Sequence, residues 1–243
     1  MGRRTALVTN VLEYGGPGTV EALEKAGYKI ACHDRTFTDP RAREAYAAAH
    51  TDIAVLSAQD PQAVVAEAIE SLTAIDALIS NDVHPNRPAP IEDVSLDDLR
   101  ATLEAVLVTP FRLAQAIIPH LKGRGTGSIV LVTSARELQP EPGFSVPTTA
   151  RGGATTFALA LARELAPSGI QVNAIAPNYL YSELYYPRDR FIDNPVGRKE
   201  IEDRVPVGRL GTPEELGNLV EFFASGKSAF VTGQVIAFTG GWP

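Results

Sequence analysis

A serine and an arginine are placed where a strand and the helix after it would bring them together. Ser134 directly follows the apolar run 129–133, and Arg151 lies seventeen positions later. A serine hydroxyl can hold an oxygen atom of a substrate by hydrogen bonding. An arginine remains a fixed positive charge because its pKa exceeds about 12. Together, these two side chains could orient an alcohol and stabilise negative charge beside it.

The turn after the first apolar run is unusual for a nucleotide site. A dinucleotide needs glycines there, so that the backbone can approach the pyrophosphate and a helix N-terminus can face it. Asn10 stands where the first glycine would fall, and the bulky Tyr14 stands where a small residue would leave room for phosphate. The turn therefore predicts no cofactor, with a degenerate but working cofactor loop as the alternative. Asp34 could bind a ribose diol or, equally, cap the loop that follows it.

Short β-branched runs alternate along the chain with longer segments of helical periodicity. The predicted strands are 6–9, 29–33, 53–57, 77–80, 128–133, 171–176 and 234–238. The predicted helices are 19–26, 41–49, 62–71, 96–121, 148–165 and 213–224. Strands separated by helices of this length favour right-handed crossovers. We therefore predict one α/β domain over 1–243, Rossmann-like and doubly wound, with a mainly parallel seven-stranded sheet and helices on both faces.

A sheet of this kind binds ligands beyond the carboxyl ends of its strands. The residues just after Thr9, Ser80, Thr133 and Ala176 should therefore ring one cleft. The segment 178–194 is marked by prolines and is predicted to be a loop that borders this cleft.

Composition excludes several classes of function. Apolar residues make up 44% of the chain and charged residues 21%, which is typical of a globular domain. The net charge of −7 and the lack of a basic run disfavour nucleic acid as a partner. The one cysteine, Cys32, excludes an intrachain disulfide, and no charged-then-apolar leader opens residues 1–8, so a cytoplasmic protein is expected. Neither 170–176 nor 128–132 approaches the roughly 20 residues of a membrane span, and no membrane anchor or metal site is predicted.

These motifs occur in an order that resembles one family. Ser134 and Arg151 carry the resemblance, with further segments spread over essentially the whole chain: Thr9-Asn10, Cys32-His33-Asp34, Ser80-Asn81-Asp82, Ala176-Pro177-Asn178-Tyr179-Leu180 and Phe238-Thr239-Gly240-Gly241-Trp242-Pro243. The chain resembles the halohydrin dehalogenases, which are related to the short-chain dehydrogenases/reductases. The latter carry serine, then tyrosine thirteen residues on, then lysine four beyond, whereas halohydrin dehalogenases use arginine in place of lysine.

The resemblance implies a cofactor-independent carbon–halide lyase. In that chemistry, the hydroxyl of a vicinal haloalcohol loses its proton while its oxygen attacks the neighbouring carbon and expels halide, and no hydride moves. Ser134 would hold the substrate oxygen, a tyrosinate would take the proton, and Arg151 would lower the tyrosine pKa from about 10. The reverse reaction would open epoxides with small anions such as azide, cyanide or nitrite.

Pro147 departs from this pattern. It lies thirteen residues after Ser134 and four before Arg151, where the family has its tyrosine, and proline cannot take up a proton. The first turn of a helix tolerates proline, and Ser145 is expected to cap that helix. Removing a general base typically costs about 10²–10⁴ in rate, so native dehalogenation should be weak unless another group substitutes. The candidate substitutes are Thr148, Thr149, His84 and Tyr185.

The resemblance also implies a halide site after the sixth predicted strand. Backbone N–H groups in a turn, set among aromatic walls, can bind a large and weakly hydrated anion without a full opposing charge. The implied anion-binding residues are Tyr14, Pro177, Asn178, Tyr179, Leu180 and Tyr186. Tyr179 and Leu180 would supply N–H groups, while the tyrosines would form walls or simply pack the loop onto the sheet. His84 and Pro85 are expected to line the substrate pocket, whose ligands would be a small haloalcohol or epoxide and a small anion.

Two other functions remain open. One is a divergent NAD(P)-dependent short-chain reductase, which cofactor titration would reveal. The other is a catalytically silent binding or scaffolding protein, for which Pro147 is the best support. By the same resemblance, helices 96–121 and 148–165 are similar to those that pair between subunits, so a homo-oligomer, in particular a homotetramer, is expected.

Overall fold

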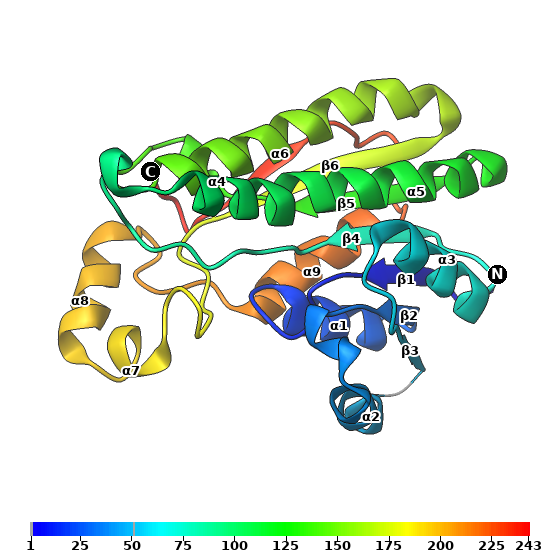
Figure 1. The fold of residues 1–243 in the computed structure, drawn as a ribbon, viewed down its shortest axis with the longest axis horizontal. Helices are drawn as coiled ribbons and strands as arrows, with labels where there is room; N and C mark the ends of the chain where they lie inside the picture. Colours follow the sequence, from blue (N-terminus) through cyan, green and yellow to red (C-terminus); the bar gives the residue numbers. More distant parts are fainter. Residues whose placement is uncertain (1, 51) are drawn as a thin grey trace.

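The computed structural model describes residues 2–50 and 52–243 (Figure 1). Met1, the first residue of the segment inspected for a leader, lies outside them. The strands are β1 (Thr5–Val8), β2 (Lys29–Cys32), β3 (Ile53–Val55), β4 (Ala77–Ser80), β5 (Gly127–Val132), β6 (Ile170–Pro177) and β7 (Val235–Phe238). They form one parallel sheet in the order β3-β2-β1-β4-β5-β6-β7, which confirms the predicted fold. The strand order changes direction between β1 and β4, and ligands bind at such a point in open sheets.

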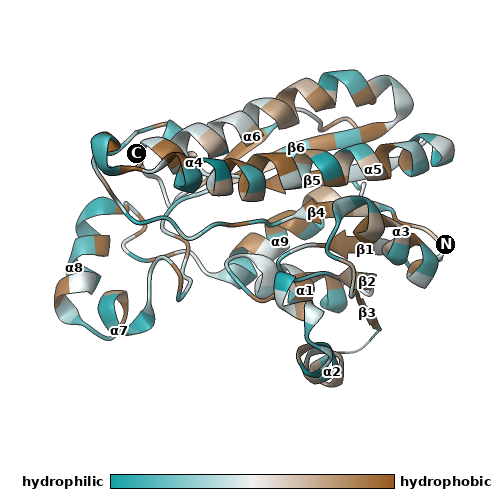
Figure 2. Ribbon diagram, in the orientation of Figure 1, coloured by the Kyte–Doolittle hydropathy of each residue, from teal (hydrophilic) through white to brown (hydrophobic). Residues whose placement is uncertain are grey.

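Helices cover both faces of this sheet. They are α1 (Gly16–Lys25), α2 (Pro40–Ala49), α3 (Pro61–Leu72), α4 (Leu96–Leu103), α5 (Thr109–Arg124), α6 (Ser145–Leu165), α7 (Arg188–Phe191), α8 (Pro195–Arg204) and α9 (Pro213–Ala224). Because successive strand residues point to opposite faces, the sheet has two cores. Residues of α3, α5 and α6 build one core, and residues of α1 and α9 build the other. Figure 2 shows hydrophobic residues concentrated on the strands and on the helices that pack against them.

The long helix predicted over 96–121 is not a regular α-helix. A π-helical turn at Glu104–Val108 separates α4 from α5, and the Thr109 N–H bonds the carbonyl of Glu104, five residues back. Pro110 follows directly, and a proline has no N–H to donate and crowds the carbonyl four residues before it. The wider turn accommodates that proline, and such turns are frequent at functional sites.

Helix α6 begins earlier than predicted. It starts at Ser145 instead of 148, and the expected cap by Ser145 is wrong: Phe144 is the N-cap residue and makes no side-chain capping bond. The first intrahelical bond runs from the Thr148 N–H to the Phe144 carbonyl, at 3.0 Å. Pro147 therefore lies in the first turn, where its missing N–H would have had no intrahelical partner.

The segment predicted as a loop over 178–194 also contains regular structure. Ser182 and Tyr186 form an antiparallel bridge, and the short helix α7 follows. Neither α7 nor α8 is among the helices predicted from the sequence. Helix α8 buries only Gly197 and Ile201, so it lacks the apolar stripe by which a helix is found in a sequence.

The stretch Leu96–Arg124 is long and apolar enough, by length and composition alone, to cross a membrane. Its residues Leu113, Ile117 and Leu121 are buried in the core on one face of the sheet. A core helix passes the same test, and these contacts place the stretch in the core of an α/β domain.

Candidate functional site

One pocket brings together almost all of the predicted site residues. The predicted residues that line it are Tyr14, His84, Ser134, Pro147, Arg151, Pro177, Asn178, Tyr179, Leu180 and Tyr186. Pro85 does not line this pocket, although its neighbour His84 does. Because the lining includes the residues that follow β5 and β6, the pocket lies beyond the carboxyl ends of these strands, as expected for a parallel sheet.

Ser134 and Arg151 are both held by the end of β5. The backbone N–H of Arg136 donates to Ser134 Oγ at 3.2 Å, which leaves the serine proton available for a substrate oxygen. Arg151 is buried and donates from a guanidinium nitrogen to the Val132 carbonyl at 2.9 Å. A positive charge held in a pocket with little water exerts a stronger field than one at the surface.

Pro147 lines the same pocket and brings no group that can exchange a proton. Two of the four candidate substitutes, His84 and Tyr185, also line it. Thr148 and Thr149 instead line a second hollow, beside Pro142. The position of these two threonines therefore separates them from Ser134 and Arg151.

At another part of the pocket wall, the side-chain oxygen of Asn178 accepts two hydrogen bonds. Its Oδ1 accepts from the Tyr179 N–H at 3.0 Å and from the Tyr186 hydroxyl at 3.3 Å. Its Nδ2 is buried and has no partner among the described residues. The predicted N–H donor of Tyr179 is thus engaged by its neighbour in this structure. Rotation of the Asn178 amide would free both donors for a small anion, and the amide N–H, unpaired in this structure, could then serve as a third.

Aromatic rings surround these polar groups. Tyr14 contacts Tyr185 edge to face at 5.6 Å between ring centroids, and Tyr179 lies 5.5 Å from Tyr186. Burial raises the pKa of Tyr186 to about 12, against an opposing effect of the Arg136 charge. Burial likewise raises the pKa of Tyr14 well above its ordinary value, although Arg151 opposes it. These hydroxyls are therefore neutral donors at pH 7. The rings both line the pocket and pack against one another, so the two interpretations offered for them are compatible.

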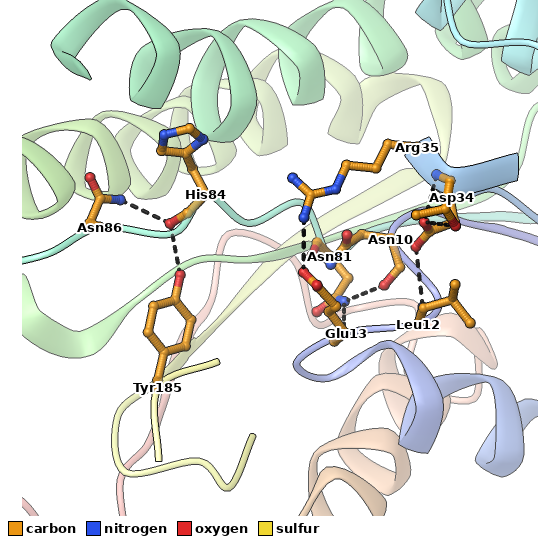
Figure 3. Close-up of polar contacts among 10 residues, drawn as sticks. Asn10, Leu12, Glu13, Asp34, Arg35, Asn81, His84, Asn86 and Tyr185 are labelled. Carbon is orange, nitrogen blue, oxygen red and sulfur yellow. Dashed lines mark hydrogen bonds and ion pairs between the residues drawn. The ribbon is translucent and has the colours of Figure 1, made fainter. Parts of the chain in front are cut away.

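The turn that would hold a nucleotide is filled by the protein's own side chains. Asn10 and Tyr14 have φ angles of 50° and 57°, the left-handed conformation that glycine adopts most readily. Asn81 fixes this turn by donating to the carbonyls of Asn10 and Glu13, both at 3.0 Å (Figure 3). Tyr14 lines the pocket from this turn. Its ring stands where a pyrophosphate would need bare backbone.

Asp34 is engaged by the loop that follows it and by the turn after β1. One carboxylate oxygen accepts from the N–H and the hydroxyl of Thr36, at 2.9 and 2.8 Å. The other accepts from the Leu12 N–H at 3.3 Å. The capping interpretation of Asp34 is confirmed. These residues do not fit a dinucleotide, because a bulky Tyr14 occupies the turn that would need glycine and Asp34 would have to share its oxygens with a ribose.

Several residues that line the pocket are not predicted from the sequence. Arg136 stacks its guanidinium 3.9 Å above the ring of Phe144 and pairs with Glu141. Other missed lining residues are Asn86, Thr102, Val106, Thr133 and Phe144. The lining contains two arginines and no aspartate or glutamate, which favours negatively charged ligands. Arg136 could have been found, since it follows Ser134 by only two residues.

Asp82 is a buried carboxyl at the strand-order reversal. It accepts from the hydroxyls of Ser80, at 2.6 Å, and Thr9, at 2.9 Å, and burial raises its pKa. It therefore ties the ends of β1 and β4 together. Within residues 2–50 and 52–243, no group of three or more His, Cys, Asp or Glu side chains could hold a metal ion.

Comparison with known proteins gives two kinds of relative. A family model described as enoyl-(acyl carrier protein) reductase matches residues 16–243. The acetoacetyl-CoA reductase of Shinella zoogloeoides is 31% identical over 242 residues, covering 98% of each chain.

The solved structures include two dehalogenases. One, described as a dehalogenation enzyme, is 34% identical with a TM-score of 0.95, covering 99% of this chain and 98% of that one. The other is halohydrin dehalogenase HheC bound to ethyl (2S)-oxiran-2-ylacetate, which is 38% identical with a TM-score of 0.95, covering 98% of this chain and 97% of that one.

Proposed function

Because this chain belongs to the short-chain dehydrogenase/reductase family, we propose that it uses the family fold without a nucleotide, as a halohydrin dehalogenase scaffold. Its reaction would convert vicinal haloalcohols to epoxides plus halide and, in reverse, open epoxides with small anions. One observation carries this proposal. Tyr14 occupies the turn in which a nucleotide would bind and lines the same pocket as Ser134 and Arg151. In that pocket, the Tyr179 N–H and the Tyr186 hydroxyl converge on Asn178 Oδ1.

Each part of the pocket has a role in this reaction. The Ser134 hydroxyl holds the substrate oxygen, and the Arg151 charge favours the oxyanion that forms as the hydroxyl proton passes to solvent water, since Pro147 offers no base. The C–O bond forms as the carbon–halogen bond breaks, and the halide departs with the bonding electron pair. The departing anion is received by the Tyr179 N–H and the Tyr186 hydroxyl, among rings that suit a weakly hydrated ion.

The comparisons support this choice. The two dehalogenase structures are 34% and 38% identical to this chain, whereas the acetoacetyl-CoA reductase is 31% identical. The bound molecule in one of them is an epoxide ester. We also propose that the protein acts in the cytoplasm, where a free thiol such as Cys32 stays reduced.

A second candidate function is an NAD(P)-dependent reductase. The family model and the acetoacetyl-CoA reductase favour it, because both are described as reductases. It would require the Tyr14 ring to leave its turn and Asp34 to give up the bonds to Leu12 and Thr36.

The decisive experiment compares the natural chain with Pro147→Tyr. Both proteins are incubated with a small vicinal bromoalcohol without cofactor, and bromide release is measured. We expect Pro147→Tyr to release bromide about 10²–10⁴ times faster, since it restores a general base between Ser134 and Arg151. The helix accepts the change because its first turn makes no use of the N–H at position 147.

Adding Ser134→Ala to the Pro147→Tyr variant is the matched control, and it should remove most of the gain. If neither protein releases bromide while NAD(P)H binds with micromolar affinity, the chain is a reductase. If neither protein releases bromide and NAD(P)H does not bind, the chain is a catalytically silent binding or scaffolding protein.

A further inference from the structure

The loop before α7 carries a second phenol into the pocket. The Tyr185 N–H donates to the carbonyl and the hydroxyl of Ser182, at 3.3 and 3.2 Å, and the Ser182–Tyr186 bridge closes the same turn. The Tyr185 ring meets Tyr14 edge to face, at an interplanar angle of 83°. This tight turn and the aromatic contact hold the ring in the pocket wall.

The Tyr185 hydroxyl is placed for proton exchange. It donates to the backbone carbonyl of His84 at 3.0 Å (Figure 3). It shares the pocket with Arg151, the positive charge that the family sets beside its tyrosine. Asn86 donates to the same His84 carbonyl at 2.9 Å, so this acceptor is fixed in place.

His84, the other substitute in the pocket, is less well placed. The charges that act on its ring are those of Arg35 and Asp98, and Arg151 is not among them. Its contribution to Tyr185 is made by its backbone carbonyl, not by its imidazole. Of the two candidates, Tyr185 is the one that brings a hydroxyl into the pocket and whose pKa, raised by burial, the Arg151 charge lowers.

We infer that Tyr185 performs the proton transfer that Pro147 cannot, acting from the loop before α7 on an epoxide held by Ser134. This inference rests on the proposed function. In the epoxide-opening direction, an anion such as azide forms a bond to one ring carbon, and the electron pair of the broken C–O bond passes to oxygen. That oxygen takes the Tyr185 proton, and the tyrosinate recovers a proton from water.

The environment of Tyr185 favours this direction. Burial raises its pKa above the ordinary value, although Arg151 and Arg136 oppose the shift. A phenol that stays protonated at neutral pH is a proton donor and a poor base. The natural chain should therefore catalyse the opening of epoxides by anions better than it releases halide from haloalcohols.

A double-mutant cycle tests this inference. The four proteins are the natural chain, Tyr185→Phe, Pro147→Tyr and the double variant, and the reaction is the opening of a small terminal epoxide by azide. We expect Tyr185→Phe to slow the natural chain by about 10²-fold or more. In the Pro147→Tyr background, Tyr185→Phe should lower the rate of epoxide opening by less than about threefold, because the phenol introduced at position 147 can then transfer the proton.

The control is Tyr181→Phe, which removes a neighbouring hydroxyl that bonds exposed Glu183 and should leave the rate unchanged. If Tyr185→Phe lowers the rate of epoxide opening equally in both backgrounds, Tyr185 is a structural residue and the inference is wrong. The inference is also wrong if Tyr185→Phe does not slow the natural chain. If Pro147→Tyr is itself inactive with azide and with bromoalcohol, the proposed function fails instead.

Discussion

At the scale of single residues, Asn178 shows how a pocket can hold donors ready for an anion. Its Oδ1 accepts from Tyr179 and Tyr186, so the two donors already converge on one point. Its Nδ2 is buried without a partner among the described residues, and an unpaired buried donor is costly. A bound anion would give that donor a partner, which is a physical reason for the site to bind one.

Replacing Asn178 with aspartate should weaken anion binding. Asn178→Asp places a negative charge beside the proposed anion, and we expect bromide affinity to fall at least tenfold. Bromide quenching of the intrinsic fluorescence measures it. Asn218→Asp, an identical charge change at an exposed site of α9, should leave the affinity unaltered. Unchanged bromide affinity in Asn178→Asp would place the anion elsewhere.

Tyr186 makes the folded state sensitive to alkali. Its pKa is about 12 in the folded protein and about 10 in an unfolded chain, so folding favours the neutral phenol. This stabilisation is complete below pH 10 and is lost as the pH rises from 10 to 12. We expect the free energy of unfolding in urea to fall over that interval, with on the order of 1–3 kcal/mol due to Tyr186.

The comparison of Tyr186→Phe with the natural chain checks this expectation. The variant should lose less stability between pH 10 and 12, because phenylalanine has no proton to release. Parallel curves for the two proteins would contradict the assignment.

At the scale of elements, α1 and α9 approach each other backbone to backbone. A Cβ on Gly217 of α9 would collide with the carbonyl oxygen of Gly18 in α1, and a Cβ on Gly18 would collide with the carbonyl of Pro213. The close contact sets the position of α1, which begins directly after the turn that carries Tyr14.

Gly217→Ala should therefore be destabilising, by about 1–3 kcal/mol, because the methyl group forces the two helices apart. Urea unfolding measures the change. Gly123→Ala is the matched control within α5, since a Cβ there meets nothing within 4 Å. That variant should be more stable than the natural chain by about 0.5–1 kcal/mol. Equal effects at the two positions would show that the interhelical contact is not the constraint.

The sheet could be predicted from the sequence because each strand is a short β-branched run between turn residues. All seven strands lie within two residues of their predicted bounds. The π turn before Pro110 was missed, because periodicity averages over such a local change. Helix α8 was missed because it buries too few residues to show a stripe.

The site was predictable where it depends on strand ends. Ser134, Pro177 and Asn178 follow or end parallel strands, whose carboxyl ends share one edge. The engagement of the Tyr179 N–H by Asn178 was not predictable, since it depends on a side-chain rotation. The position of Tyr185 in the pocket that holds Arg151 likewise depends on how the loop after β6 folds back.

At the scale of the whole molecule, α5 and α6 expose aromatic surface. Phe111 of α5 is 45% exposed and lies 5.4 Å from the ring of Phe157 in α6. An exposed apolar patch of this kind favours contact with another protein surface. Together with the resemblance, it leads us to propose a homotetramer built through these helices.

Light scattering after size-exclusion chromatography tests the assembly. We expect a mass about four times that of the 26.0 kDa chain. Phe111→Arg should lower this mass by placing a charge in the contact, whereas Val196→Arg on the hydrophilic helix α8 should not. A monomer in the natural chain would rule the tetramer out.

The main chain at Asn10 and Tyr14 has a consequence for redesign of this turn. Both residues hold the left-handed conformation, which glycine adopts readily and which strains a tyrosine. Glycine at these two positions would therefore fit the existing main-chain path. Two substitutions would give the turn a glycine-rich sequence without rerouting its backbone.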